Sequence, residues 1–334
     1  MEYSIRFATK SDTNAIMEYI DEFWRKGHIL ARNRELFEWQ YGGDTKLNIV
    51  LGIGEDKRIY GMLGFIPYGT SEKKDIALAL WKAEPGTGFL GVRLLRFLME
   101  NEPHREIVCP GINMQTTSKI YEYVGMSVDK MVQWYRLADR SSYLIAKVAD
   151  REIPPYKNTA DQMGLIEVDS VEELRKLGVD HSETSKIPNK TEKYIEKRYF
   201  EHPIYQYQVY AIDENKNGTE NKNRTIIVLR IQECNGARAL RLIDCIGDPN
   251  RILNITEALD KLMDELVCEY IDTYEAGMDE DVFWNAGWRK VEEEGNIIPD
   301  YFSPFEHRKV DIYYSTSNKR AVLFKGDGDQ DRPN

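Results

Sequence analysis

A glycine-rich loop that opens a helix is the stretch of this sequence best suited to chemistry. Gly86, Gly88 and Gly91 follow the spacing GxGxxG, and apolar residues then recur at helical spacing over residues 92–99. Glycines let a backbone approach a ligand closely, and the first turn of a helix has unpaired N–H groups at the positive end of its dipole. The combination predicts an anion site, most often one for phosphate.

Groups that could move a proton lie on either side of this loop. Tyr121 carries a phenol that could act as an acid, although a single tyrosine in a helix is more often a packed aromatic. Asp75 and Glu84 flank the strand predicted over residues 76–82 and are candidate bases, or simply solvated strand ends. His28 is predicted to lie at the surface or at a helix end.

The glycine spacing is also found in dinucleotide-binding folds, which require further features. Those folds place the motif in the first strand–helix unit of a parallel sheet, with an acidic residue about 20 positions later. Here the loop follows two strands that form a hairpin pattern, and the next strand ends at Cys109-Pro110-Gly111 without an acid. The dinucleotide interpretation is therefore disfavoured.

The elements that position these residues occur twice along the chain. Polar and proline-containing residues 151–163 are predicted to link a domain of residues 1–150 to a second domain of residues 164–334. Strands at residues 130–135 and 143–148 are predicted to close the first domain. Lys82 and Asp244 are 162 residues apart, as are Gly125 and Gly287. A repeat this long indicates duplicated domains.

The two copies differ at the positions best suited to chemistry. Where the first has its loop glycines, the second has Asp248, Asn250 and Leu253, and an aspartate there repels phosphate. Where the first has Tyr121, the second has Phe283. The sequence thus predicts one equipped copy and one that has lost this equipment.

Bulk composition limits the classes of function. The chain has 334 residues, of which 42% are apolar and 30% charged, and no apolar run reaches about 18 residues, so no membrane span is expected. No secretory signal is visible, and four scattered cysteines without a CxxC pair predict a cytoplasmic protein without a metal site. The formal charge of −11 argues against nucleic acid as a partner.

The order of elements resembles that of the GCN5-related N-acetyltransferase family. The segment Lys119-Ile-Tyr-Glu-Tyr-Val-Gly-Met126 carries the closest similarity, while Gly86 and Phe89 depart from the family's usual loop. The resemblance implies an α/β (α+β) fold of two tandem domains, each a mixed, mostly antiparallel sheet flanked by helices. It implies acyl-CoA as co-substrate and Tyr121 as the general acid. The implied cofactor-binding residues are Trp81, Lys82, Ala83, Gly86, Thr87, Gly88, Phe89, Leu90, Gly91 and Asn113.

Tandem chains with a degenerate second half resemble nucleotide-sugar N-acyltransferases of bacterial surface-polysaccharide pathways, such as that of anthrose biosynthesis. This implies transfer of an acetyl or 3-hydroxybutyryl group to the amine of a dTDP-linked amino-dideoxyhexose. The acceptor is expected between the halves, near Arg32, Trp39, Tyr41, Arg230, Arg241 and Asp244. A structural Arg–Asp pair at the domain interface is the alternative for the last three residues.

Other functions remain open at this point. The acceptor could be a peptide or another small amine, and a non-catalytic CoA-binding module would show the same loop. Transfer of aminoacyl groups from tRNA is disfavoured by the negative charge. The sequence leaves open which sugar, nucleotide and acyl chain are used, and the oligomeric state.

Overall fold

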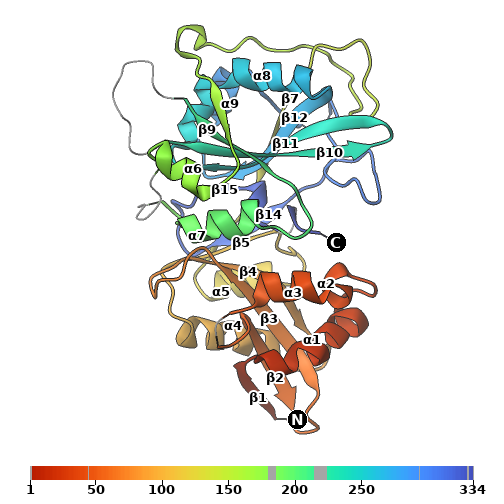
Figure 1. Cartoon of the computed structure of the whole chain (residues 1–334). Helices are drawn as coiled ribbons and strands as arrows, with labels where there is room; N and C mark the ends of the chain where they lie inside the picture. Colours follow the sequence, from red (N-terminus) through yellow and green to blue (C-terminus); the bar gives the residue numbers. More distant parts are fainter. Residues whose placement is uncertain are drawn as a thin grey trace.

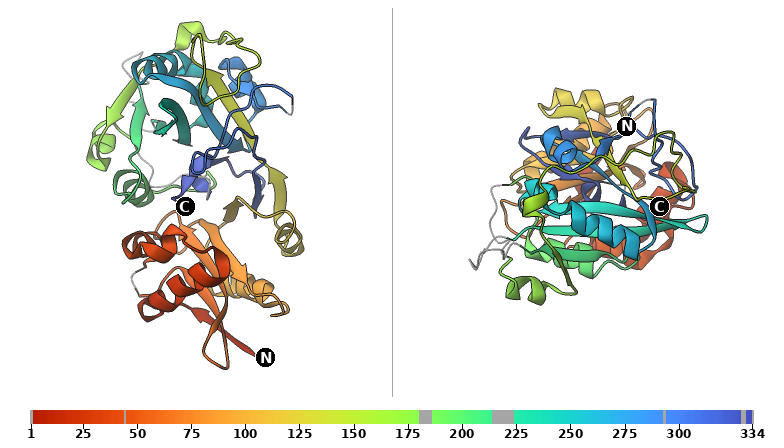
Figure 2. Two further views of the ribbon diagram at one scale, coloured as in Figure 1. Left: turned by 90° about the vertical axis from the view of Figure 1, so that its right-hand side faces the viewer. Right: turned by 90° about the horizontal axis from the view of Figure 1, so that it is seen from above.

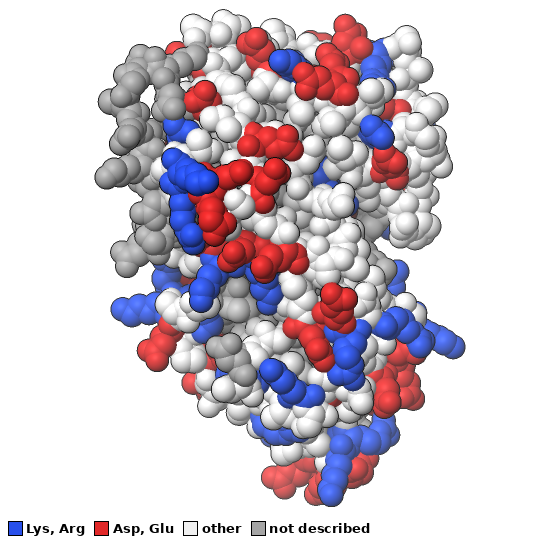
Figure 3. All heavy atoms as spheres, in the orientation of Figure 1, with Lys and Arg blue, Asp and Glu red and all other residues white. Residues whose placement is uncertain are grey.

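The computed structural model describes residues 2–43, 45–179, 186–213, 224–292, 294–328 and 331–333. It forms two lobes, with the N-terminus at the far end of the first lobe and the C-terminus at the waist between them (Figures 1 and 2). Acidic and basic side chains are interspersed over the face drawn in Figure 3. Each lobe contains a mixed sheet with helices packed on it, which confirms the predicted fold class.

The first sheet is antiparallel apart from one parallel pair, β4 with β5. Its strands, in spatial order, are β1 (Tyr3–Phe7), β2 (Ile49–Gly54), β3 (Ile59–Pro67), β4 (Ile76–Ala83), β5 (Ile107–Pro110), β14 (Tyr313–Thr316) and β6 (Ser127–Lys130). The helices of this lobe are α1 (Thr13–Tyr19), α2 (Ile29–Arg32), α3 (Arg34–Tyr41), α4 (Leu90–Asn101) and α5 (Ser118–Tyr123).

Helices cover both faces of this sheet. Leu94, Leu95 and Leu98 of α4 are fully buried in one apolar cluster with strand residues such as Leu63. On the opposite face, α1 to α3 bury side chains such as Phe37 against the sheet. In these helices apolar residues recur every three or four positions, which puts their side chains on one side of each helix.

The second sheet repeats this order. Its strands are β13 (Arg289–Lys290), β7 (Val132–Leu137), β12 (Cys268–Ala276), β11 (Ala237–Ile246), β10 (Ile226–Cys234), β9 (Gln208–Ile212) and β8 (Leu165–Val168), with β15 (Leu323–Phe324) paired to β12. The helical elements of this lobe are α6 (Val171–Lys176), α7 (Glu192–Ile195), η4 (Glu196–Phe200), η5 (Pro249–Asn254), α8 (Thr256–Glu265), α9 (Glu280–Asn285) and η6 (Lys325–Asp327).

The two lobes exchange one strand each. β7 pairs with β12 in the second sheet, and β14 pairs with both β5 and β6 in the first. Figure 1 labels β7 beside β12 and β14 close to β5. The prediction that residues 130–135 close the first domain is therefore wrong. Trp134 and Tyr135 are buried, and the Trp134 ring stacks 4.9 Å from that of Phe283, so β7 needs cover that the other lobe provides.

Residues 143–148 were expected to form a strand, and they do not. They make a single bridge, between Lys147 and Ile297. The division at residues 150 and 163 stays a prediction, while the exchange shows that each lobe takes one strand from outside its own range.

Candidate active site

A bulge in β4 lies at the centre of the first lobe. The ladder with β3 pairs Leu63 with Trp81 and Gly64 with Ala79, which leaves Leu80 as an extra residue. Leu80 has a φ of 57°, a left-handed conformation that costs a non-glycine residue about 1 kcal/mol. A bulge redirects backbone groups away from the ladder, and such strain is often found at functional sites.

The sheet opens beside this bulge. β4 and β5 pair only at Ile76 with Ile107 and at Ala77 with Val108. The predicted cofactor residues Trp81, Lys82 and Ala83 therefore lie on the edge of β4 beyond the parallel ladder. An edge of this kind offers backbone donors and acceptors to a ligand that enters the split.

The glycine loop presents the start of α4 without a cap. Gly86 and Gly88 have φ angles of 82° and 64°, which glycine adopts readily. The N-cap residue Phe89 makes no side-chain hydrogen bond to the helix, and the first turn contains no acid. Phe89 is also 82% exposed. The first N–H groups of α4 are thus open to an anion.

Tyr121 lies where the split begins. Its ring is buried, and its hydroxyl is 3.0 Å from the Cys109 Sγ of β5. That sulfur also contacts the Leu78 carbonyl of β4, at 3.6 Å. The centre of the Trp81 ring lies 5.3 Å from the centre of the Tyr121 ring. The phenol is therefore both a packed aromatic and a polar group at the split.

A small cavity adjoins the bulge on the side of α1 to α3. It measures about 110 Å³ and is lined by Leu80, His28 and Tyr41, together with Arg332 and others. His28 is buried, and its Nδ1 accepts the N–H of Leu30. The helix-end prediction for His28 is confirmed, but its place beside the bulge was not foreseen, because no sequence pattern relates the α1–α2 turn to β4.

The structure does not bring the two predicted carboxylates to the bulge. Asp75 is fully buried, 2.8 Å from the Arg105 Nε, and it accepts the N–H of Asn189 at 2.7 Å. It is thus an ion-paired contact between the lobes, and the solvated alternative is wrong. Glu84 lies at the other end of β4, 3.9 Å from Arg58. Neither carboxylate lines the small cavity.

The predicted acceptor residues of the first lobe are dispersed. Tyr41 lines the small cavity, and Trp39 lines a larger one between the lobes. Arg32 is 60% exposed and pairs with Asp21 at 2.8 Å. The side chain of Asn113, which was predicted to bind the cofactor, accepts the N–H of Gln115 in a turn before α5.

The predicted acceptor residues of the second lobe are engaged in internal contacts. Arg230 pairs with Asp331 at 2.7 Å, and Arg241 pairs with Asp272 at 2.6 Å. Asp244 accepts hydrogen bonds from Lys190 and Tyr199 and is fully buried. The predicted cluster does not form an open site, and the structural alternative describes these residues, with different partners.

The second lobe has the same bulge and split, but the split is filled. The ladder of β10 with β11 skips Ile243, and β11 pairs with β12 only as far as Asp272. Residues 323–327, called here the plug, enter the gap: β15 pairs with the end of β12, and Gly326 packs against Ile243. Lys325 of the plug is buried in an ion pair with Asp300.

The loop after β11 is also closed to an anion. Asp248 accepts the N–H of Asn250, so this helical segment is capped by its own carboxylate. The second lobe thus differs from the first at both features: the plug fills its split, and Asp248 caps its loop.

The sequence matches no protein-family model and no curated protein. A GCN5-related N-acetyltransferase from Anabaena variabilis has a similar structure, with a TM-score of 0.55 and 11% identity over 95% of this chain and 73% of that one. A putative acetyltransferase from Pyrococcus horikoshii has a TM-score of 0.48 and 13% identity, over 96% of this chain and 91% of that one. A GCN5-related N-acetyltransferase from Sphaerobacter thermophilus has a TM-score of 0.43 and 10% identity, over 97% of this chain and 96% of that one.

The chain thus has the fold of the GCN5-related N-acetyltransferases. Among the described residues, no helix is long and apolar enough to cross a lipid bilayer.

Proposed function

We propose that this protein is an acyl-CoA-dependent N-acyltransferase with one cofactor site, in the first lobe, and that its acceptor is the amine of a nucleotide-linked amino sugar. The observation that carries the proposal is the Leu80 bulge at the open end of the β4–β5 split. The same fold element in the second lobe is filled by the chain itself.

The residues of the first lobe fit coenzyme A. The uncapped start of α4, with Gly86 and Gly88 before it and Gly91 in its first turn, suits the pyrophosphate. The open edge of β4 at residues 81–83 suits the amide-bearing pantetheine arm, because both offer backbone-type hydrogen bonds. Exposed Phe89 provides an apolar surface beside this path.

The chemistry requires attack by a neutral amine on the thioester carbonyl. Backbone N–H groups near the bulge would stabilise the oxyanion that forms, an effect that is often the largest in acyl transfer. The C–S bond then breaks, and Tyr121 would protonate the departing sulfur. The amine loses one proton and the thiolate gains one, so protons balance overall.

No carboxylate lines the small cavity within the part of the chain that the structure describes. A sugar amine is less basic than lysine, so a fraction of it is neutral at physiological pH without help from the protein. We therefore propose attack without a dedicated carboxylate base, in place of Asp75 or Glu84.

The two cavities support a large acceptor. The one at the bulge and the one between the lobes share Gln40 and Arg332 in their walls. The first is small enough for the reacting ring, and the second measures about 410 Å³, enough for a nucleotide portion. We propose a dTDP-linked amino-dideoxyhexose as acceptor and an acetyl or 3-hydroxybutyryl donor.

A thiol-release assay tests both parts. Acetyl-, 3-hydroxybutyryl- and longer acyl-CoAs are tested against dTDP- and UDP-linked amino sugars, peptides and simple amines, and the acylated product is identified by mass spectrometry. Release dependent on an amino sugar nucleotide is expected. Release only with peptides or simple amines would keep the acyltransferase and overturn its acceptor. CoA binding without turnover of any acceptor would overturn catalysis.

A further inference from the structure

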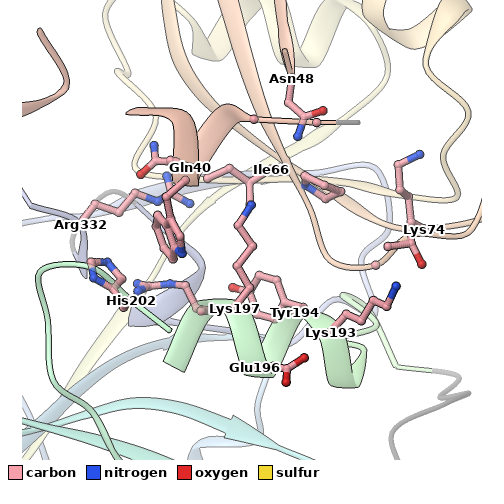
Figure 4. A pocket seen from close by; sticks show the side chains of 17 residues that line it. Gln40, Asn48, Ile66, Lys74, Lys193, Tyr194, Glu196, Lys197, His202 and Arg332 are labelled. Atoms are coloured by element: carbon pink, nitrogen blue, oxygen red, sulfur yellow. The ribbon is translucent and has the colours of Figure 1, made fainter. Parts of the chain in front are cut away.

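The larger cavity lies where the lobes meet and has walls from both (Figure 4). Trp39 and Gln40 of α3 and Ile66 of β3 come from the first lobe. α7 and η4 of the second lobe form the opposite wall, and Lys193 and Lys197 project from them into the space between the lobes (Figure 4). The two lysines are four residues apart, so they share one face of the helix.

Neither of these two lysines has an ion-pair partner within the described chain. Lys74, on the first-lobe wall of the same cavity, is by contrast 2.8 Å from Glu102. Glu196 is the acid among the lining residues, and it points away from the space into which the lysines project (Figure 4). The cavity therefore holds excess positive charge although the whole chain carries −11.

One further donor in the wall also lacks an acceptor. The Trp39 Nε1 is buried and has no hydrogen-bond partner, a state that costs about 1–3 kcal/mol for a buried donor. The Lys197 ammonium lies 5.7 Å from the centre of the same ring. Burial lowers the pKa of Lys197, because the charged form loses hydration, and the nearby Glu201 carboxylate only partly opposes this shift.

His202 adds a donor and not a base. Its Nδ1 accepts the N–H groups of Ile204 and Tyr205, at 3.1 and 3.0 Å. Burial, together with nearby Arg198, lowers its pKa to about 3, so the ring is neutral near pH 7. A neutral imidazole that accepts at Nδ1 carries its proton on Nε2.

A wall of this kind suits a ligand rich in acceptors and negative charge. We infer that the cavity between the lobes binds a phosphate or diphosphate group, with the Lys193 and Lys197 ammonium groups and the Trp39 indole N–H as its donors. Under the proposed function, on which this part rests, the group is the anionic portion of the acceptor. Because Gln40 and Arg332 line both cavities, a ligand held here can extend to the bulge.

Calorimetric titration of the full chain tests the anion site directly, without acyl-CoA. The probes are dTDP, UDP, glucose 1-phosphate and inorganic pyrophosphate, with thymidine as the uncharged control. The nucleotide diphosphates are expected to bind, and their affinity is expected to fall at higher salt concentration. Thymidine is expected not to bind. Binding of pyrophosphate as tight as that of dTDP assigns the site to the phosphates alone; tighter dTDP assigns it to a nucleotide diphosphate.

The variants Lys193→Gln and Lys197→Gln are each expected to raise the Kd for dTDP about tenfold, as removal of one charge-assisted hydrogen bond does. Trp39→Phe keeps an aromatic ring and removes the N–H, so a smaller increase is expected. Lys176→Gln makes the same charge change on an exposed residue of α6 and should leave the Kd unchanged. Unchanged melting temperatures would show that all four variants fold.

The inference is overturned if thymidine binds as well as dTDP, or if the two lysine variants match Lys176→Gln. Failure of the proposed function looks different. Diphosphate binding that depends on the lysines, without any acyl transfer, would retain the anion site and reject the activity. Acyl transfer to amino sugar nucleotides with an unchanged KM in both lysine variants would retain the activity and reject the anion site.

Discussion

The two lobes have the same sheet opening, and they use it differently. In the first, β4 separates from β5 beyond Ala77, and the loop that follows leaves a helix start uncapped. In the second, β11 separates from β12 beyond Arg241, but the plug enters the gap and Asp248 caps the loop. The difference teaches that an opening in a repeated sheet can be converted into core by a short segment of the same chain.

This conversion fixes the second lobe in place as a wall for the first. Lys190 is buried with Asp244 and with Asp327 of the plug, at 2.7 and 2.8 Å. Asp331, just beyond the plug, is held by Arg198 and by Arg230. The chain then continues into Arg332, which lines both cavities. The filled split thereby positions residues at the open one.

The strongest test removes the buried charge of the plug. Lys325→Met leaves the Asp300 carboxylate buried without its partner, so unfolding free energy should fall by about 3–5 kcal/mol. Chemical denaturation measures this loss. Lys319→Met, at an exposed site nearby, should change stability by less than about 0.5 kcal/mol. Equal losses in the two variants would show that the plug is not an anchored part of the core.

The second test uses pH to probe how dry the filled split is. Glu275, on β12 opposite the plug, accepts the Trp134 Nε1–H, and burial raises its pKa from 4.5 to about 7. Below pH 4.5 the carboxyl is protonated in both states. Between pH 4.5 and about 7 the folded protein keeps a proton on Glu275 that the unfolded chain has lost. The free energy of unfolding therefore falls as pH rises through this range, by about 3 kcal/mol in all.

Glu275→Gln should remove this contribution. Unfolding free energies of the two proteins at pH 5 and pH 8 give the comparison, and the loss between these values should be smaller in the variant. Parallel pH profiles would mean that Glu275 is ionised in the folded protein and that the filled split is not dry.

The third test concerns the residue that distinguishes α5 from α9. Tyr121→Phe copies the Phe283 of the second lobe and should lower kcat by about 10²-fold, the range for loss of a general acid. KM for acyl-CoA should change little. Tyr123→Phe, on the same helix but 67% exposed, is the matched control. Unchanged turnover in Tyr121→Phe would leave this ring as a packing residue.

The smallest expected effect has opposite signs for stability and binding. Gly91 has room for a Cβ, since its nearest neighbour would be 3.6 Å away. Gly91→Asp should stabilise α4 slightly, because a negative charge near a helix start is favourable. It should also weaken CoA binding about tenfold, because it gives the first lobe the kind of carboxylate found in the second. Calorimetry and thermal melting measure the two effects.

Gly91→Asn controls for size without charge and should bind CoA more tightly than Gly91→Asp. In the second lobe, Asp248→Ala should lower stability by about 1 kcal/mol through loss of the cap and leave the CoA affinity unchanged. A CoA affinity that changes with Asp248 and not with Gly91 would place the cofactor in the second lobe and contradict our proposal.

Much of the fold could be predicted because its signals are local. The repeated order of strands and helices follows from apolar periodicity, and the loss of the glycines and of the tyrosine in the second copy is visible in the sequence. Arg230, Arg241 and Asp244 were chosen by analogy with the first copy. That analogy failed because all three side chains are buried in ion pairs. Arg230 pairs with Asp331 beyond the plug, Arg241 pairs with Asp272 of β12, and Asp244 pairs with Lys190. Lys193 and Lys197 had a signal, two cations four residues apart on one helix face.

The sequence by itself determined which copy has a flexible glycine loop, an uncapped helix and a phenol, because these depend on residue type over a few neighbouring positions. Only the tertiary structure decided that β7 and β14 exchange lobes, that the plug fills one split, and that Lys193 and Lys197 line one cavity with Trp39. Those outcomes depend on which distant surfaces bury each other, and burial is a property of the whole chain and not of any one segment.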